Sequence, residues 1–326
     1  MTRLTHQVLK PQLFSRGINS LSWQGLSGSS LSLALAEAAM YSSAPLVYVV
    51  DNANALSVIS RDLRFFDSNL PLHVIPDWET LPYDRFSPHR EIISTRISMF
   101  NAVSSVQSGI ILVSLRSLMQ QMAPKSWIVD KSFSLEVGIN YSLSELVNKL
   151  VALGYVRRRQ VTELGDLAVR GSIIDLYPSG EKNPVRLDFL DDSLESLRYF
   201  NLGDQRSFSQ TESIKILPAR EFPLDEDSIV RFKKNWRLQF GAIGLGKGIY
   251  DDISHGIYSA GIEYYLPFFF SETSILPDYL PKESILVFDD DLKKNAKRIF
   301  EGYRERFESL EKVGERPLVS PEDILL

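Results

Sequence analysis

The stretch LSLALAEAAMYSSAPLVYVV (residues 31–50) decides the fold class, because a helix-like segment leads directly into a short run of consecutive apolar residues. Strands that are apolar on consecutive positions are typical of a parallel sheet covered by helices on both faces. The same alternation continues through NALSVISRDLRFF (54–66), LHVIPD (72–77), REIISTRISMFNAV (90–103) and GIILVSL (109–115). The pattern predicts an α/β domain with a parallel sheet over residues 1–130.

The pattern changes after residue 130. Ser142, with Glu145 three residues later, has the spacing of a capping box and predicts the start of a helix that Gly154 ends. Short strand-like segments separated by turn residues follow at 155–161, 168–178, 184–190 and 194–200. This part of the chain predicts a small α+β domain over residues 131–218.

Residues 219–326 predict a third domain of mixed, helix-rich structure. Helical patterns cover 225–240 and 289–313, and one strand, ESILVFDD (283–290), lies between them. Three domains agree with the length of 326 residues, because a single core stops growing at about 250 to 300 residues.

Composition excludes several classes of function. The absence of cysteine excludes a disulfide scaffold, a thiolate zinc site and a cysteine nucleophile. The formal net charge of −5 argues against a stand-alone DNA-binding protein. No apolar run approaches the roughly 18 to 20 residues of a membrane span, and the first residues lack the apolar core of a secretory signal. We expect a cytoplasmic monomer that does not contact a membrane.

Gly25-Leu-Ser-Gly28-Ser-Ser-Leu31-Ser32 precedes the first predicted helix and resembles a damaged P-loop. In a working loop, backbone N–H groups cradle the phosphates, a lysine contacts the β- and γ-phosphates, and the next Ser or Thr binds magnesium. Leu31 occupies the lysine position, so we predict a nucleotide site that is inactive. A simple turn that caps the helix is the alternative interpretation.

Two further motifs resemble nucleotide-binding elements. Asp289, at the tip of the strand 283–290, occupies the place of a magnesium-binding acid, although capping of the next helix explains it more simply. GAIGLGKG (241–248) has the spacing of a P-loop, but it follows a helical segment and has Gly248 in place of Ser or Thr. We predict a loop there, and we predict neither catalytic residues nor metal ligands in this chain.

Arg170 and Arg186, on neighbouring predicted strands, form the most informative pair of charged residues. Phe189 and Leu190 follow the second arginine. Arginines beside apolar side chains are typical of hot spots in protein interfaces. The cationic run Arg157–Arg159 is explained more simply as a solvated strand or turn. The arginine pair therefore predicts a surface that binds a protein partner.

The segment PDWETLPYDRFSPHREIISTRISMFN (76–101) closely resembles the N-terminal region of the bacterial transcription-repair coupling factor (Mfd) family. Further similar stretches lie at 166–200, 216–223 and 260–270. The resemblance covers nearly the whole chain. It implies a module similar to the repair helicase UvrB, with a degenerate helicase-like domain, an inserted interaction domain and a third domain packed on the first.

The resemblance implies a non-catalytic adaptor that recruits the damage sensor UvrA to stalled RNA polymerase in transcription-coupled nucleotide excision repair. The implied UvrA-binding surface includes positions that match Arg170, Arg186 and Leu190, the last of which is often aromatic in the family. RNA polymerase, DNA, ATP and magnesium are implied as partners and cofactors of other parts of the full-length protein, an ATP-dependent DNA translocase. No cofactor is expected for this module.

Two other functions stay open. One is a nucleotide-binding, helicase-like module that uses residues 25–32 or 241–248 together with Asp289. The other is a DNA-binding module that uses Arg157–Arg159 and the basic residues of 231–237. The DNA-gripping aromatic hairpin of the related helicase has no counterpart here, because Tyr83 and Asp84 run directly into RFSPHREII.

Overall fold

The chain folds into two compact units, each assembled from segments that are distant in sequence. The computed structural model describes residues 8–13 and 20–326. The first unit comprises the described residues up to Glu79, together with Ala102–Gln120 and Ile275–Gly302. The second unit comprises Thr80–Asn101, Gln121–Ser274 and Tyr303–Leu326. The division into three domains therefore stays a prediction.

The first unit is built on a parallel sheet, as the sequence predicts. Its strands are β1 (Leu46–Val50), β2 (Leu72–Ile75), β3 (Ile110–Ser114) and β12 (Ile285–Phe288), in the order β12-β1-β3-β2. All three pairings are parallel. β1 and β3 are the two central strands, and every residue of both is buried. The predicted α/β class is confirmed.

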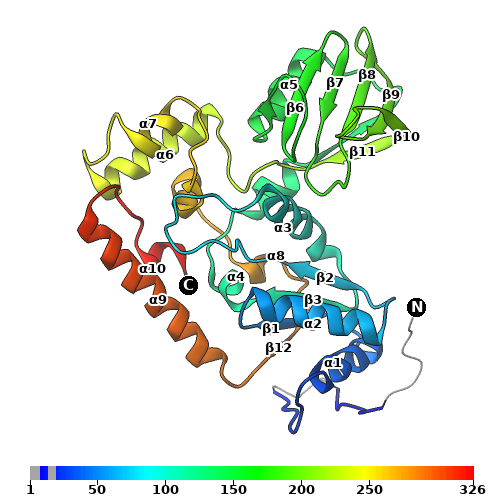
Figure 1. The fold of residues 1–326 in the computed structure, drawn as a ribbon, viewed down its shortest axis with the longest axis vertical. Coiled ribbons are helices and arrows are strands. Elements are labelled where there is room, and N and C mark those ends of the chain that lie inside the picture. The colour runs from blue at the N-terminus through cyan, green and yellow to red at the C-terminus, as the bar shows by residue number, and fades with distance from the viewer. Residues whose placement is uncertain (1–7, 14–19) are drawn as a thin grey trace. The chain divides into compact units, whose positions relative to one another are not determined.

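Helices α1 (Ser30–Tyr41) and α2 (Ala53–Phe66) pack against each other in this unit, and α2 also contacts β1, β2 and β3 (Figure 1). Asn52 caps α2 by accepting a hydrogen bond from the backbone N–H of Ala55 at 3.0 Å. The short helices α4 (Leu115–Met119), α8 (Leu276–Tyr279) and η1 (Val103–Ser105) complete the unit. It also includes the last residue of α3 (Arg90–Ala102) and the first half of α9 (Leu292–Val313).

Strand β12 belongs with the first sheet and not with the third predicted domain. Its residues Ile285 and Leu286 pair with Leu46 and Val47 of β1. About 235 residues separate the two strands in sequence, and local patterns carry no information on a pairing over that distance. Local sequence patterns therefore did not reveal that this strand of the 219–326 range pairs with the first sheet.

The second unit contains the predicted small α+β domain. After helix α5 (Leu143–Ala152), a six-stranded sheet has the order β10-β9-β8-β7-β6-β5, antiparallel except for the β5–β6 pair. Ser142 caps α5 by accepting from the backbone N–H of Glu145 at 3.4 Å, as predicted. The strands are β5 (Val156–Arg157), β6 (Asp166–Arg170), β7 (Ile173–Leu176), β8 (Val185–Leu190), β9 (Ser193–Phe200) and β10 (Ser207–Thr211), and a separate pair joins β4 (Phe133–Glu136) to β11 (Ser213–Ile216).

The rest of this unit is mostly helical. Helix α6 (Glu226–Phe240) buries Phe232 and Trp236 against an aromatic cluster that includes Tyr265 and Phe269. Residues 241–247 form turns, which confirms the predicted loop. The remaining helices of this unit are most of α3, the second half of α9, η2 (Ser126–Asp130), α7 (Gly248–Ser254), η3 (Ile262–Phe269) and α10 (Pro321–Ile324). Within the described ranges, every helix is too short or too polar to cross a bilayer.

Replacing Gly261 with alanine is expected to destabilise the second unit by about 2 to 4 kcal/mol, because strain and a backbone clash combine. Gly261 has φ +77°, and a Cβ there would lie 2.5 Å from the carbonyl oxygen of Asp84. Gly302, in the middle of α9, has open space around its Cβ position, so Gly302→Ala should stabilise by about 0.5 to 1 kcal/mol. Urea denaturation of both variants tests the pair of expectations, and equal effects would contradict them.

Candidate protein interaction site

One buried carboxylate, that of Asp175, forms ion pairs with both predicted arginines. Asp175 lies on β7, between Arg170 on β6 and Arg186 on β8, and only 1% of its side chain is exposed. Arg186 donates from Nε and Nη2 to the two carboxylate oxygens at 2.7 and 3.0 Å. Arg170 donates from Nη2 to the same carboxylate. The three strands thus bring together two arginines that lie 16 residues apart.

The two arginines differ in exposure. The Arg186 side chain is 17% exposed, its guanidinium lies 4.8 Å from the centre of the Phe200 ring, and Nη1 donates to the carbonyl oxygen of Gln205 at 3.3 Å. Its hydrogen bonds to Asp175 raise the pKa of Arg186 above the ordinary value, so the group is always charged. The Arg170 side chain is 52% exposed. Arg170 therefore offers more of its guanidinium to a partner.

Alternation along β8 separates the two apolar candidates. Leu190 is 65% exposed, whereas Phe189 is 4% exposed and belongs to the core with Val185 and Leu187. Successive side chains of a strand point to opposite faces, so a residue next to an exposed leucine points inward. The structure therefore contradicts the assignment of Phe189 to the binding surface. The period of two along VRLDFL (185–190) could have shown, from the sequence, that Phe189 and Leu190 point to opposite faces of the sheet.

A second ion pair extends the same face. Arg198 on β9 stands opposite Arg186 in the strand register, and its Nη2 donates to Asp188 of β8 at 2.6 Å. Asp175, Asp188 and Arg198 were not identified from the sequence, because their relevance depends on strand register. We call this surface the arginine face and define it as Arg170, Asp175, Arg186, Asp188, Leu190 and Arg198.

The predicted nucleotide loop has lost more than its lysine. Gly25 and Gly28 have positive φ angles of +75° and +54°, as a tight turn requires, but residues 20–24 contain no strand that leads into it. The Leu31 side chain packs against the apolar core formed by α1, α2 and the sheet. Ser32 is fully buried, and its hydroxyl has no hydrogen-bond partner among the described residues. The lysine position thus serves core packing.

Asp289 lies at the end of β12, where its carboxylate accepts from the Tyr48 hydroxyl at 3.4 Å. Partial burial raises the pKa of Asp289, and the neighbouring acid Asp51 adds to this effect. The backbone carbonyl of Asp289 accepts from Leu292 at the start of α9, but its side chain makes no capping bond in the described part of the chain. The predicted capping role of this side chain is therefore not observed. Groups of three or more acids, histidines or cysteines that could hold a metal are absent from the described residues.

The basic clusters of the DNA-binding alternative lie apart in the second unit. Arg157, Arg158 and Arg159 are exposed, and Arg158 approaches the buried carboxylate of Asp166 at 3.8 Å. On α6, Lys233, Lys234 and Arg237 line an open groove of about 480 Å³ together with Val230 and Leu238. No contact joins the two clusters in the described interactions.

Comparison with known proteins connects the arginine face to a family. The UvrB interaction domain matches residues 133–222, which include the whole face. The chain is 37% identical over 295 residues to the transcription-repair-coupling factor of Haemophilus influenzae, covering 90% of this chain and 26% of that protein. Identity to the Escherichia coli factor is also 37%, over 305 residues, with 92% and 26% covered. Identity to the Bacillus subtilis factor is 25% over 301 residues, with 87% and 25% covered.

The chain spans about a quarter of the length of these relatives. The match nevertheless extends over both compact units, and the matched interaction domain carries the ordered pair of arginines. The chain therefore belongs to the transcription-repair-coupling factor family, of which it forms the UvrB-like module.

Proposed function

We propose that this module recruits UvrA to stalled RNA polymerase during transcription-coupled nucleotide excision repair, and that the arginine face is its contact surface. The observation that carries the proposal is the sharing of one buried carboxylate by Arg170 and Arg186 inside the matched UvrB interaction domain. Such an arrangement fixes two guanidinium groups in place before a partner arrives, which lowers the entropy lost on binding.

The charges of the arginine face favour an acidic patch on the partner. Arg170 and Arg186 share one negative charge, so this trio has a net charge of 2 − 1 = +1. A guanidinium can pair with a carboxylate through two parallel hydrogen bonds, and Arg170 has donors to spare because only Nη2 contacts Asp175. A carboxylate of UvrA that approaches Arg170 would complete the charge balance.

Leu190 would supply the apolar part of the contact. It is 65% exposed and stands on the same face of β8 as Arg186 and Asp188. An apolar side chain that is exposed in the free protein can become part of the water-excluded centre of an interface when the partner binds. UvrA would therefore offer an apolar depression beside its acidic group.

The proposal assigns no catalysis and no cofactor to this module. This part of the proposal is supported by Leu31, whose side chain packs against the core. The loop therefore lacks the cation that contacts the β- and γ-phosphates in a working P-loop. In this proposal, contacts with RNA polymerase and DNA and the use of ATP and magnesium belong to other parts of a longer protein. The module would act in the cytoplasm as a monomer.

Isothermal titration calorimetry of purified UvrA with this chain tests the proposal. Saturable binding with one module per UvrA subunit is the expected result. If no binding is detected at tens of micromolar of both proteins, the module does not recruit UvrA on its own and the proposal fails.

Leu190 offers a variant in each direction. Leu190→Ala should weaken UvrA binding by about threefold to tenfold, and Leu190→Phe should strengthen it by about threefold, because buried apolar area falls in one and rises in the other. The side chain is exposed, so neither change should move the thermal unfolding midpoint. Equal affinities for all three proteins would remove Leu190 from the interface.

Calorimetric titration with ATP and magnesium separates the adaptor from a nucleotide-binding module. We expect no saturable heat at millimolar nucleotide, because Leu31 replaces the phosphate-binding lysine and its side chain is packed in the core. Micromolar binding that disappears in a Gly28→Val variant would instead support the nucleotide-binding alternative.

A further inference from the structure

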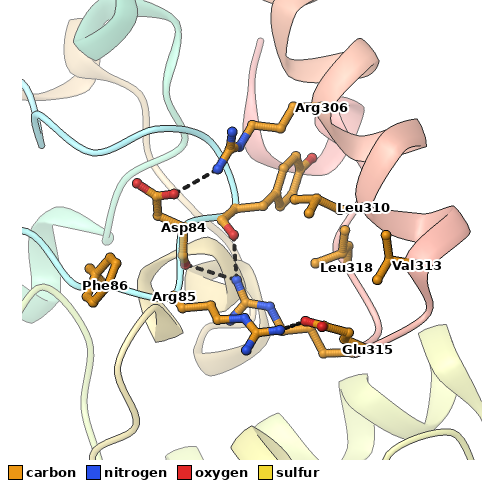
Figure 2. Close-up of a pocket in the computed structure, with 10 residues that line it drawn as sticks. Asp84, Arg85, Phe86, Arg306, Leu310, Val313, Glu315 and Leu318 are labelled. Atoms are coloured by element: carbon orange, nitrogen blue, oxygen red, sulfur yellow. Dashed lines mark hydrogen bonds and ion pairs between the residues drawn. The ribbon is translucent and has the colours of Figure 1, made fainter.

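The second unit contains a cavity of about 270 Å³ that lies outside the arginine face. Its walls come from the end of α9, from the loop of residues 83–86 and from the segment after α9. Figure 2 shows Leu310, Val313 and Leu318 on one side of it and Arg85 and Phe86 on the loop side. Three apolar side chains and an exposed aromatic residue thus surround a space that the chain does not fill.

Two arginines hold the loop in place. Nη2 of Arg316 donates to the carbonyl oxygens of Tyr83 and Asp84 at 2.6 and 2.9 Å. Arg306 donates to the Asp84 carboxylate at 2.8 Å (Figure 2). It also donates to the carbonyl oxygen of Pro82. These bonds fix the backbone of the loop that forms one wall of the cavity.

Tyr83 carries two features that a purely structural residue rarely combines. It is 2% exposed, and its hydroxyl has no hydrogen-bond partner among the residues that the structure describes. Its φ angle of +60° lies in the left-handed region, which is unusual for a bulky side chain. Burial raises the pKa of Tyr83, so the hydroxyl keeps its proton. Backbone strain of this kind tends to occur in segments that bind a ligand, and Tyr83 belongs to the loop that forms one wall of the cavity.

The charges around the cavity are unbalanced. Its lining has three arginines against one aspartate and one glutamate, which gives 3 − 2 = +1. The Arg85 side chain, 66% exposed, is paired with Glu315, which is 55% exposed. Exposed ion pairs contribute little to stability. Arg85 can therefore exchange Glu315 for a carboxylate of another molecule.

We propose that this cavity anchors a tryptophan or tyrosine side chain from an acidic segment of a partner protein. A volume of about 270 Å³ lies below the roughly 300 to 1,000 Å³ of small-molecule sites and suits a single large side chain. The apolar walls of the cavity, formed by Leu310, Val313 and Leu318, bury the ring of such a side chain. Acidic residues beside the aromatic anchor pair with Arg85.

Methyl NMR of the chain, labelled at leucine and valine, tests this site with three synthetic peptides. The probe is acetyl-Glu-Glu-Trp-Glu-Glu-amide, and the controls replace its Trp with Ala or its Glu residues with Lys. The probe should shift the methyl signals of Leu310, Val313 and Leu318 saturably at submillimolar concentration. Both controls should bind at least tenfold more weakly.

Two variants locate the contact, each with a matched control. Val313→Trp fills the cavity and should abolish binding, whereas Val230→Trp, at a similarly exposed valine on α6, should not. Arg85→Ala should weaken binding about fivefold, and Arg61→Ala, at another exposed and paired arginine, should have no effect.

Several results would overturn the assignment. The first is the absence of any shift at these three methyl groups with millimolar probe. The second is equal binding of the Lys-flanked peptide, which would remove the role of charge. The third is tighter binding of N-acetyltryptophan amide or of a short single-stranded DNA at the same methyl groups, which would make the cavity a small-molecule or nucleic-acid site.

Discussion

UvrA binding is expected to weaken by about tenfold or more when either Arg170 or Arg186 is replaced with alanine, which corresponds to about 1.4 kcal/mol or more for each variant. Arg170 loses a direct contact, because its exposed guanidinium is the group that an acidic partner reaches first. Arg186 loses its own contact and also the hydrogen bonds that hold Asp175 in place. Calorimetric titration of UvrA with each variant gives the affinities.

The two variants should differ in their effect on folding. Arg170→Ala leaves Asp175 bound to Arg186, so the free energy of unfolding should stay close to that of the parent. Arg186→Ala leaves a carboxylate that is 1% exposed with fewer partners, so this variant should also lower the thermal midpoint. Arg186→Lys, which restores the charge but not the paired hydrogen bonds, should recover the stability only in part.

Arg157→Ala is the matched control for both variants. Arg157 is an exposed arginine of the same sheet, and it lies outside the arginine face. Its replacement should leave UvrA affinity unchanged. If Arg170→Ala and Arg186→Ala bind as tightly as the parent while Arg157→Ala loses affinity, the contact surface lies elsewhere on this domain.

The largest expected effect on stability comes from the ion pair between Arg96 and Glu221. Their side chains are 0% and 2% exposed, and Nε of Arg96 lies 2.5 Å from Oε1 of Glu221. The Arg96 guanidinium also lies 5.1 Å from the centre of the Phe100 ring. Glu221→Gln should lower the free energy of unfolding by about 3 to 5 kcal/mol, because a buried guanidinium would lose its counter-charge.

A double variant distinguishes the cost of removing the Glu221 charge alone from the net contribution of the ion pair to the free energy of unfolding. Arg96→Met combined with Glu221→Leu removes both charges and keeps apolar volume, so it should be much more stable than Glu221→Gln alone. Urea denaturation followed by circular dichroism gives the three free energies. A loss below about 1 kcal/mol for Glu221→Gln would mean that solvent reaches Arg96 more readily than its burial indicates.

Local patterns predicted much of the fold. The capping residue Ser142 and the terminating Gly154 define α5, and the alternation of helices with apolar runs predicts the parallel sheet. Leu31 at the lysine position was visible in the chain as it stands. These features involve residues within a few positions of one another, and hydrogen bonds and side-chain periodicity over such distances depend on the local sequence.

Other features required the tertiary structure. The sequence placed Arg170 and Arg186 on neighbouring strands, but only the strand register places Asp175 between them and Arg198 beside them. The period of two along β8 could have shown that Phe189 faces the core, although a choice between the two faces needs the packing of the sheet.

The sequence by itself thus determined the α/β and α+β classes, the loss of the phosphate-binding lysine and the pair of arginines. The tertiary structure alone decided the pairing of β12 with β1, the carboxylate shared by the arginines and the cavity beside Tyr83. The physical reason is distance along the chain. Contacts between distant segments form because a shared core buries their apolar surfaces together. A local pattern of apolar residues predicts that one face of a segment is buried, but it does not predict which other segment packs against that face.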